Sequence, residues 1–217
     1  MSGIAEWSRM HGGVLPGSAA QGWLRGVQRL AQWGPVARTS PDALSAAGVV
    51  TTAGALAAAW PGGRWALLAA LLVVLAGVLD GLDGAVALAT GRTRPLGAVV
   101  DAAADRVGDL LLVAILLVLG APAGWCVAVA VLVTLHEYLR ARAQAAGMPG
   151  MGAVTAAERP TRVIVVAVAC LGTGVLPGGT PFTGWNWAAV CAIGFTVVAV
   201  AGLVHLVLGI RRTIPAA

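Results

Sequence analysis

Two pairs of aspartates carry the strongest chemical signal in this sequence. Asp80 and Asp83 are three residues apart, and Asp101 and Asp105 are four apart, so the members of each pair lie on one face of a helix. All four stand among apolar residues, where neighbouring carboxylates need protons or cations. Hard oxygen ligands of this kind suit Mg²⁺ or Mn²⁺. We therefore predict a divalent metal site built from these four carboxylates; the alternative is four unrelated aspartates at helix ends.

The composition indicates the setting of this site. Of the 217 residues, 59% are hydrophobic and 11% are charged, against about 25% charged in an ordinary soluble domain. This excludes a typical solvated globule and indicates a membrane protein. All 14 basic residues are arginines, and the net charge of +5 fits arginines at a membrane surface better than nucleic acid binding. We expect no signal peptide, and we expect reduced core thiols at Cys126, Cys170 and Cys191.

The apolar segments predict an all-α, polytopic membrane protein with six transmembrane helices. A spanning helix needs about 20 mostly apolar residues. The segments that meet this need are residues 43–63, 65–89, 97–119, 125–143 and the two halves of 163–210. A turn-rich stretch at 176–187 divides the last run. The aspartate pairs flank the loop between the second and third segments, so we expect them at one depth.

The arginines predict the orientation. With the N-terminus in the cytoplasm, Arg64 is the only arginine on an outer loop. Arginines inside favour this arrangement, so we expect both termini in the cytoplasm and the active site at the cytoplasmic face of the cell membrane. The predicted domains are residues 1–39, 40–212 and 213–217: an N-terminal cytoplasmic segment, the membrane domain and a short tail.

Residues 21–33 read as an amphipathic helix within the N-terminal segment. Trp23, Leu24, Val27 and Leu30 recur at helical spacing, and glutamines and arginines take the other face. This pattern favours a helix lying on the inner membrane surface. The alternative is a short helix that packs on the protein itself.

The aspartates belong to a longer pattern that resembles a known family. The segment DGLDGAVAL runs from Asp80 to Leu88, and GAVVDAAAD follows after eight residues, from Gly97 to Asp105. All four aspartates, both glycines, Ala87 and every gap match the signature of the CDP-alcohol phosphatidyltransferases. The family usually has arginine where this chain has Leu88, and that arginine helps to hold the donor's phosphates. Arg92 or Arg94 could reach in from the following loop instead.

The resemblance implies a reaction and roles for these residues. CDP-diacylglycerol would donate its phosphatidyl group to an alcohol, and CMP would leave. Asp80, Asp83 and Asp101 would bind two Mg²⁺ or Mn²⁺ ions in a homodimeric enzyme. Asp105 would join them as a ligand and act as general base. The segment SPDALS resembles the family's Pro-Asn-x-x-Thr motif. The residues implied to bind the CDP donor are Asp42, Ser45, Asp80, Gly84, Ala87, Arg92 and Gly97.

The segments YLRARA and ERPTR point to the acceptor. Arginine forks suit phosphate, and both segments resemble those of bacterial phosphatidylinositol-phosphate synthases, which use inositol 1-phosphate. The implied acceptor-phosphate residues are Arg140, Arg142 and Arg159. That subgroup also carries an arginine in its last span, and this chain has none there before Arg211. Phosphatidylglycerophosphate synthase, which uses glycerol 3-phosphate, therefore stays open.

Two other classes also stay open. A cation transporter would use the aspartates as ion sites, but transporters usually show repeated halves, and we find none. A catalytically inactive relative that binds CDP-lipid is suggested by Leu88. Asp109 lies two turns from Asp101, and we expect it to pair with Arg106 or a residue of the fourth span in a structural network.

Overall fold

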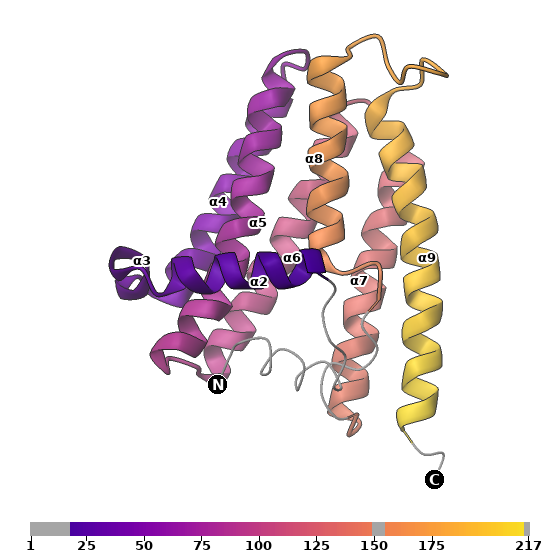
Figure 1. Cartoon of the computed structure of the whole chain (residues 1–217). Coiled ribbons are helices and arrows are strands. Elements are labelled where there is room, and N and C mark those ends of the chain that lie inside the picture. Colours follow the sequence, from indigo (N-terminus) through magenta and orange to yellow (C-terminus); the bar gives the residue numbers. More distant parts are fainter. Residues whose placement is uncertain (1–17, 149–154, 215–217) are drawn as a thin grey trace.

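The computed structural model describes residues 18–148 and 155–214, and within these ranges it is all-helical (Figure 1), which confirms the predicted class. The helices are α2 (Ser18–Ala31), α3 (Gly34–Arg38), α4 (Pro41–Ala59), α5 (Trp65–Thr90), α6 (Pro95–Val118), α7 (Ala123–Ala145), α8 (Arg159–Val175) and α9 (Trp187–Thr213). Residues 1–17 of the predicted N-terminal segment, Arg9 among them, and 215–217 of the predicted tail lie outside the described residues.

Capping residues fix where the long helices begin and end. Ser40 precedes α4, and its hydroxyl accepts a hydrogen bond from the Ala43 amide at 3.2 Å, as N-cap residues do. Prolines occupy the first turns of α4, α6 and α8, where a missing N–H costs nothing. Gly91 ends α5 with a positive φ of 66°, a conformation that glycine adopts without strain. The tight connection from Gly91 to Pro95 turns the chain back, so α5 and α6 form a hairpin.

The six long helices run side by side, and α2 lies across them at one level (Figure 1). α5 packs against α4 and α8, α4 packs against α6, and α9 packs against α7 and α8. Half of the buried residues of α5 are alanines, namely Ala66, Ala69, Ala70 and Ala76, which lets neighbouring helices approach closely.

One glycine positions α8 against the site. A Cβ on Gly77 of α5 would lie 2.9 Å from Cγ1 of Val163 on α8, closer than real side chains approach. Gly77 lies about one turn before Asp80, and Val163 lies about one turn after Arg159. The close approach of α5 and α8 therefore brings the Arg159 end of α8 beside Asp80.

Among the described residues, α4, α5, α7 and α9 are long and apolar enough to cross a membrane. α6 carries Asp101, Asp105, Arg106 and Asp109, and α8 has 17 residues. The first predicted segment ends earlier than expected, at Ala59, because Gly62 and Gly63 take positive φ values of 69° and 54° in a turn. The fifth begins earlier, at Arg159, because Pro160 starts the helix.

α2 corresponds to the amphipathic helix predicted over residues 21–33. It ends at Ala31, so Trp33 falls outside it and precedes α3. Val27 and Ala31 are buried in a cluster with Leu82 and Val86 of α5, while Trp23 and Leu30 are each 44% exposed. The helix thus packs on the protein through part of its apolar face, and contact of the rest with a membrane surface stays a prediction.

Candidate active site

Three of the predicted aspartates meet at the α5–α6 hairpin. Each of Asp80, Asp101 and Asp105 offers a carboxylate oxygen, and the three oxygens all lie within 4.8 Å of one another. Asp80 comes from α5, and the other two come from successive turns of α6. Three hard oxygen donors at this separation suit a divalent cation such as Mg²⁺ or Mn²⁺. These three carboxylates thus come together, as the sequence predicted for the two pairs, and their depth in a membrane stays a prediction.

Asp83, the fourth predicted ligand, borders this group. Its carboxylate is buried and accepts hydrogen bonds from the Ser45 hydroxyl at 2.5 Å and from the Gly84 amide at 2.6 Å. Its carboxyl group lies near that of Asp101. Ser45 belongs to α4, so α4 orients an acidic side chain of α5.

Arg159 inserts its guanidinium among the aspartates. Its Nη2 atom lies 3.0 Å from an oxygen of Asp80, and its Nη1 atom forms an ion pair with Asp105. Gly108 leaves room for this side chain, because a Cβ there would lie 3.0 Å from Nη2 of Arg159. The sequence predicted Arg159 as a phosphate ligand but not its contact with Asp80 and Asp105. The sequence carried one sign of this contact: Gly108, three residues after Asp105, has no side chain and leaves room for the arginine.

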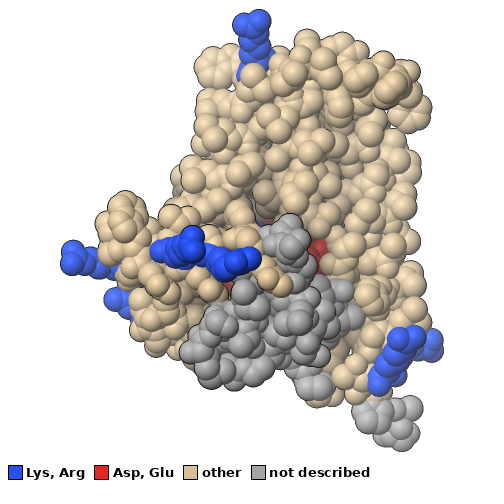
Figure 2. All heavy atoms as spheres, viewed as in Figure 1, with Lys and Arg blue, Asp and Glu red and all other residues tan. Residues whose placement is uncertain are grey.

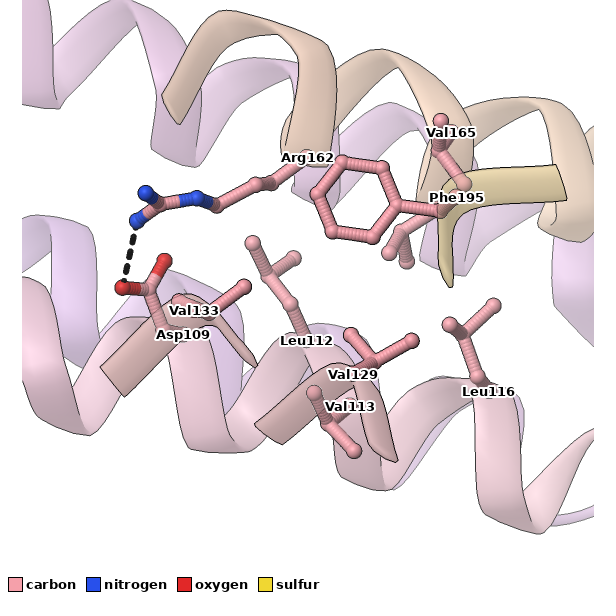
Figure 3. Close-up of a pocket in the computed structure, with 10 residues that line it drawn as sticks. Asp109, Leu112, Val113, Leu116, Val129, Val133, Arg162, Val165 and Phe195 are labelled. Atoms are coloured by element: carbon pink, nitrogen blue, oxygen red, sulfur yellow. Dashed lines mark hydrogen bonds and ion pairs between the residues drawn. The ribbon is translucent and has the colours of Figure 1, made fainter. Parts of the chain in front are cut away.

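A network of charged side chains lies about one turn of α6 beyond the three aspartates. Asp109 is 3.0 Å from Arg106 and accepts a 2.8 Å hydrogen bond from Arg162, and Arg162 also donates to Glu137 at 2.7 Å. Figure 3 shows the Arg162–Asp109 pair at one end of a cavity of about 20 Å³, lined otherwise by apolar residues such as Phe195. The predicted structural pairing of Asp109 with Arg106 is confirmed, and Arg162 was missed as its second partner.

The other two predicted acceptor arginines have different surroundings. Arg140 is buried, and it donates to both carboxylate oxygens of Glu158, at 2.5 and 3.0 Å. Burial of Glu158 favours its neutral form, but the hydrogen bonds and charge of Arg140 outweigh burial and hold the pKa of Glu158 below its ordinary value. Arg142 is exposed on the same helix. Of the three arginines, Arg159 is thus the one in contact with the aspartates.

The predicted donor-binding residues lie near the start of α4, in the last turns of α5, in the α5–α6 loop and near the start of α6. Asp42 forms an ion pair with Arg94, and a Cβ on Gly97 would meet both side chains, at 3.1 Å from Cγ of Arg94 and 3.8 Å from an oxygen of Asp42. Gly84 faces open space, and Ala87 is partly buried. Arg92 donates to the Thr39 carbonyl at 3.4 Å.

An apolar groove leads away from the aspartates. Its volume is about 570 Å³, and Asp80 and Arg159 line one end. The remaining lining residues come from α2, α5 and α8: Trp23, Val74, Gly77, Gly81, Pro160, Val163, Ile164, Ala167 and Val168. The site therefore joins a cluster of charged groups to an elongated apolar surface, an arrangement suited to a molecule with an anionic head and an apolar tail.

The sequence profile of the CDP-alcohol phosphatidyltransferase family matches residues 38–206. The chain belongs to this family. The matched region contains the three converging aspartates, Arg159 and the residues of α5 and α8 that line the groove, so the family's signature and the observed geometry coincide.

Two relatives, each named as an inositol phosphate synthase of a phospholipid or archaeal lipid, are about one third identical to this chain over the aligned residues. The phosphatidylinositol phosphate synthase of Mycolicibacterium smegmatis is 34% identical over 200 residues, which cover 84% of this chain and 85% of that protein. The archaetidylinositol phosphate synthase of Pyrococcus horikoshii is 34% identical over 114 residues, which cover 52% of this chain and 60% of that protein.

Solved structures of a family member share the fold. The structure of the Mycobacterium tuberculosis phosphatidylinositol phosphate synthase with CDP-DAG bound is 26% identical in sequence, with a TM-score of 0.65 over 89% of this chain and 98% of that one. The structure of the same enzyme with manganese and citrate has the same TM-score and identity, and covers 88% of this chain and 93% of that one.

Proposed function

We propose that this protein transfers the phosphatidyl group of CDP-diacylglycerol to a phosphorylated alcohol, inositol 1-phosphate, and releases CMP. The observation that carries this proposal is the convergence of Asp80, Asp101 and Asp105 at family signature positions, at the end of an apolar groove. The relatives named as phosphatidylinositol phosphate synthases support the choice of acceptor. Membership of this family also disfavours a cation transporter.

The site fits divalent cations. Asp80, Asp101 and Asp105 supply oxygen donors at suitable spacing, Asp83 would complete the set, and the manganese-bound relative supports the assignment. We propose two ions, Mg²⁺ or Mn²⁺. When bound, such ions would offset the charge of the donor's pyrophosphate and of the departing CMP.

Asp105 is the proposed general base. It would accept the proton of the acceptor's hydroxyl while that oxygen forms a bond to the donor's β-phosphorus and the bond from this phosphorus to the oxygen of CMP breaks. Arg159 contacts Asp105 and is the proposed contact for a phosphate on the acceptor. Arg140 and Arg142 stay as further proposed contacts, although Arg140 already binds Glu158.

The groove is the proposed place for part of the donor's lipid. An acyl chain along Val74, Ile164 and Ala167 would leave the pyrophosphate beside Asp80, because both line the same cavity. The cytidine end would then lie toward Asp42, Ser45 and Gly97. Gly84, which faces open space, would allow close approach of the donor to α5.

The protein is a membrane protein, and we propose that all six long helices span the bilayer. α6 and α8 run beside the four candidate spans (Figure 1), and the charges of α6 are paired or face the site. In Figure 2 the arginines gather at the level of α2 and at the end of α9, and one lies at the opposite end. This asymmetry supports cytoplasmic termini, a site at the cytoplasmic face of the cell membrane and α2 at its surface. We also propose a homodimer, which light scattering in detergent would test.

A panel of acceptors tests the proposed reaction. Purified protein is given CDP-diacylglycerol, Mg²⁺ and one of inositol 1-phosphate, glycerol 3-phosphate, inositol or serine, and CMP release is measured. We expect release with inositol 1-phosphate. Glycerol 3-phosphate is the second candidate, because α9 has no arginine before Arg211. If no acceptor gives CMP release although the protein is folded and binds CDP-lipid, the protein is an inactive relative.

A further inference from the structure

The turn of α5 that follows the aspartates holds no cation. Leu88 stands where the family signature has arginine, and its side chain is 47% exposed. On the proposed function, an anionic pyrophosphate must approach a site that already contains four carboxylates. A cation from another element near the start of α6 would offset part of that repulsion.

Arg94 lies on the face of α6 that carries the aspartates. Gly97, Asp101 and Asp105 are spaced by four residues, so they share one face of the helix. A Cβ on Gly97 would lie 3.1 Å from Cγ of Arg94; the stem of Arg94 therefore crosses this face one turn, about 5.4 Å along the axis, from Asp101. Gly97 clears the space that the arginine uses.

The partner of Arg94 is an exposed carboxylate. Arg94 pairs with Asp42, and their side chains are 56% and 34% exposed. Ion pairs with this much exposure to water contribute little to stability, so Arg94 can exchange Asp42 for a phosphate at little cost. Asp42 lies one turn before Ser45, the residue that orients Asp83. The pair is therefore about one helical turn from Ser45 on α4 and, through Gly97, about one turn from the proposed metal ligand Asp101 on α6.

The other arginine of the same loop has a different partner. Arg92 donates to the Thr39 carbonyl at the α3–α4 junction, at 3.4 Å. It contacts the backbone before α4, whereas Arg94 lies over Gly97. Of the two loop arginines, Arg94 is the one on the aspartate-bearing face.

We propose that Arg94 binds the phosphate of the CDP-lipid donor in this chain, and that Asp42 pairs with Arg94 only until the donor's phosphate takes its place. This inference rests on the proposed function and assigns a residue to its donor subsite. The sequence offered Arg92 or Arg94 as the replacement for the family arginine and gave Arg92 and Asp42 donor contacts; the structure favours Arg94 over Arg92.

Donor binding by the full-length protein in detergent tests the assignment. Binding of radiolabelled CDP-diacylglycerol is measured with Mg²⁺ and without acceptor, so turnover does not interfere. The variants are Arg94→Gln, Arg94→Lys, Asp42→Asn, Arg92→Gln and, as a matched control from the exposed end of α3, Arg38→Gln. Thermal unfolding of each variant verifies folding.

We expect Arg94→Gln to weaken binding about tenfold, because a charge-assisted hydrogen bond is lost. Arg94→Lys should have a donor affinity between those of wild type and Arg94→Gln, since the charge remains but the two-pronged guanidinium contact is lost. Asp42→Asn should tighten donor binding by freeing Arg94. Arg38→Gln should bind as wild type does.

Three outcomes overturn the assignment: Arg94→Gln binding as tightly as the control, the loss falling on Arg92→Gln instead, or equal losses in Asp42→Asn and Arg94→Gln, which would mark a purely structural pair. The proposed function fails separately. Wild type that binds donor through Arg94 but releases no CMP with any acceptor would overturn that function and leave the Arg94 assignment standing.

Discussion

Arg159 of α8 forms an ion pair with Asp105 of α6, across 54 residues of sequence. The pair joins the proposed contact for the acceptor's phosphate to the proposed base for its hydroxyl. A small acceptor whose phosphate is held by Arg159 would have its hydroxyl within reach of Asp105, and positioning of this kind lowers the entropic part of the barrier.

Asp105→Asn should lower CMP release at least a hundredfold, because the amide cannot accept the proton. The variant keeps the shape of the side chain, so folding and binding of CDP-lipid should be largely retained. Turnover and equilibrium binding are measured on the same preparation. Near-normal turnover would remove Asp105 from the base role.

Arg159→Gln should raise the KM for the acceptor about tenfold, because a charge-assisted contact to phosphate is lost. It should also lower the Mg²⁺ concentration needed for half-maximal donor binding, since the guanidinium no longer competes for Asp80 and Asp105. Both titrations are compared with Arg211→Gln, an exposed arginine at the end of α9. An unchanged acceptor KM would contradict the phosphate contact.

Ile164→Trp should block the groove beside α8. Ile164 lines the groove and is 60% exposed, so the larger side chain can be accommodated without disturbing the core. We expect a higher KM for donors with long acyl chains and a smaller change for donors with short ones. Val197→Trp on α9, also exposed and outside the groove lining, is the matched control. Equal effects on long- and short-chain donors would place the acyl chain elsewhere.

Much of this architecture follows from local sequence. The long apolar runs gave the helices, and the spacing of Asp80, Asp101 and Asp105 gave their convergence, because a helical hairpin with a short turn returns the chain to the same depth. Both inferences need only helix periodicity and one tight connection. The predicted helix ends were less accurate, since glycines near residue 62 and a proline at residue 160 shift the observed ends by a few residues.

The partners of the arginines could not be predicted in this way. Arg159, Arg140 and Arg162 all lie in the two segments interpreted as phosphate-binding. Packing of α8 against α5 and α6, together with ion pairs between α7 and the start of α8, gives each of them a carboxylate partner. Which arginine meets which acid depends on close approaches such as Gly77 with Val163. In a single sequence, such a close approach of two helices is visible only as an isolated small residue.

Arg162→Met should destabilise the protein by about 3–5 kcal/mol, the usual cost of breaking a buried ion pair. Only 4% of the Arg162 side chain is exposed, and it bonds Asp109 and Glu137 on different helices. Removal of the guanidinium leaves two carboxylates short of a partner where water has little access. The free energy of unfolding is measured in mixed micelles by titration with a denaturing detergent.

Arg106→Gln is the control for this loss, because Arg106 contacts the same Asp109 from the preceding turn of α6. Its side chain is 32% exposed, so water can replace part of the lost contact, and we expect a cost of about 1 kcal/mol or less. The double variant Arg162→Met with Asp109→Leu should recover part of the stability, since the second substitution removes one of the two carboxylates that lost their partner. If Arg106→Gln and Arg162→Met cost the same, burial does not set the strength of this network, and its role in holding α6, α7 and α8 together would have to be abandoned.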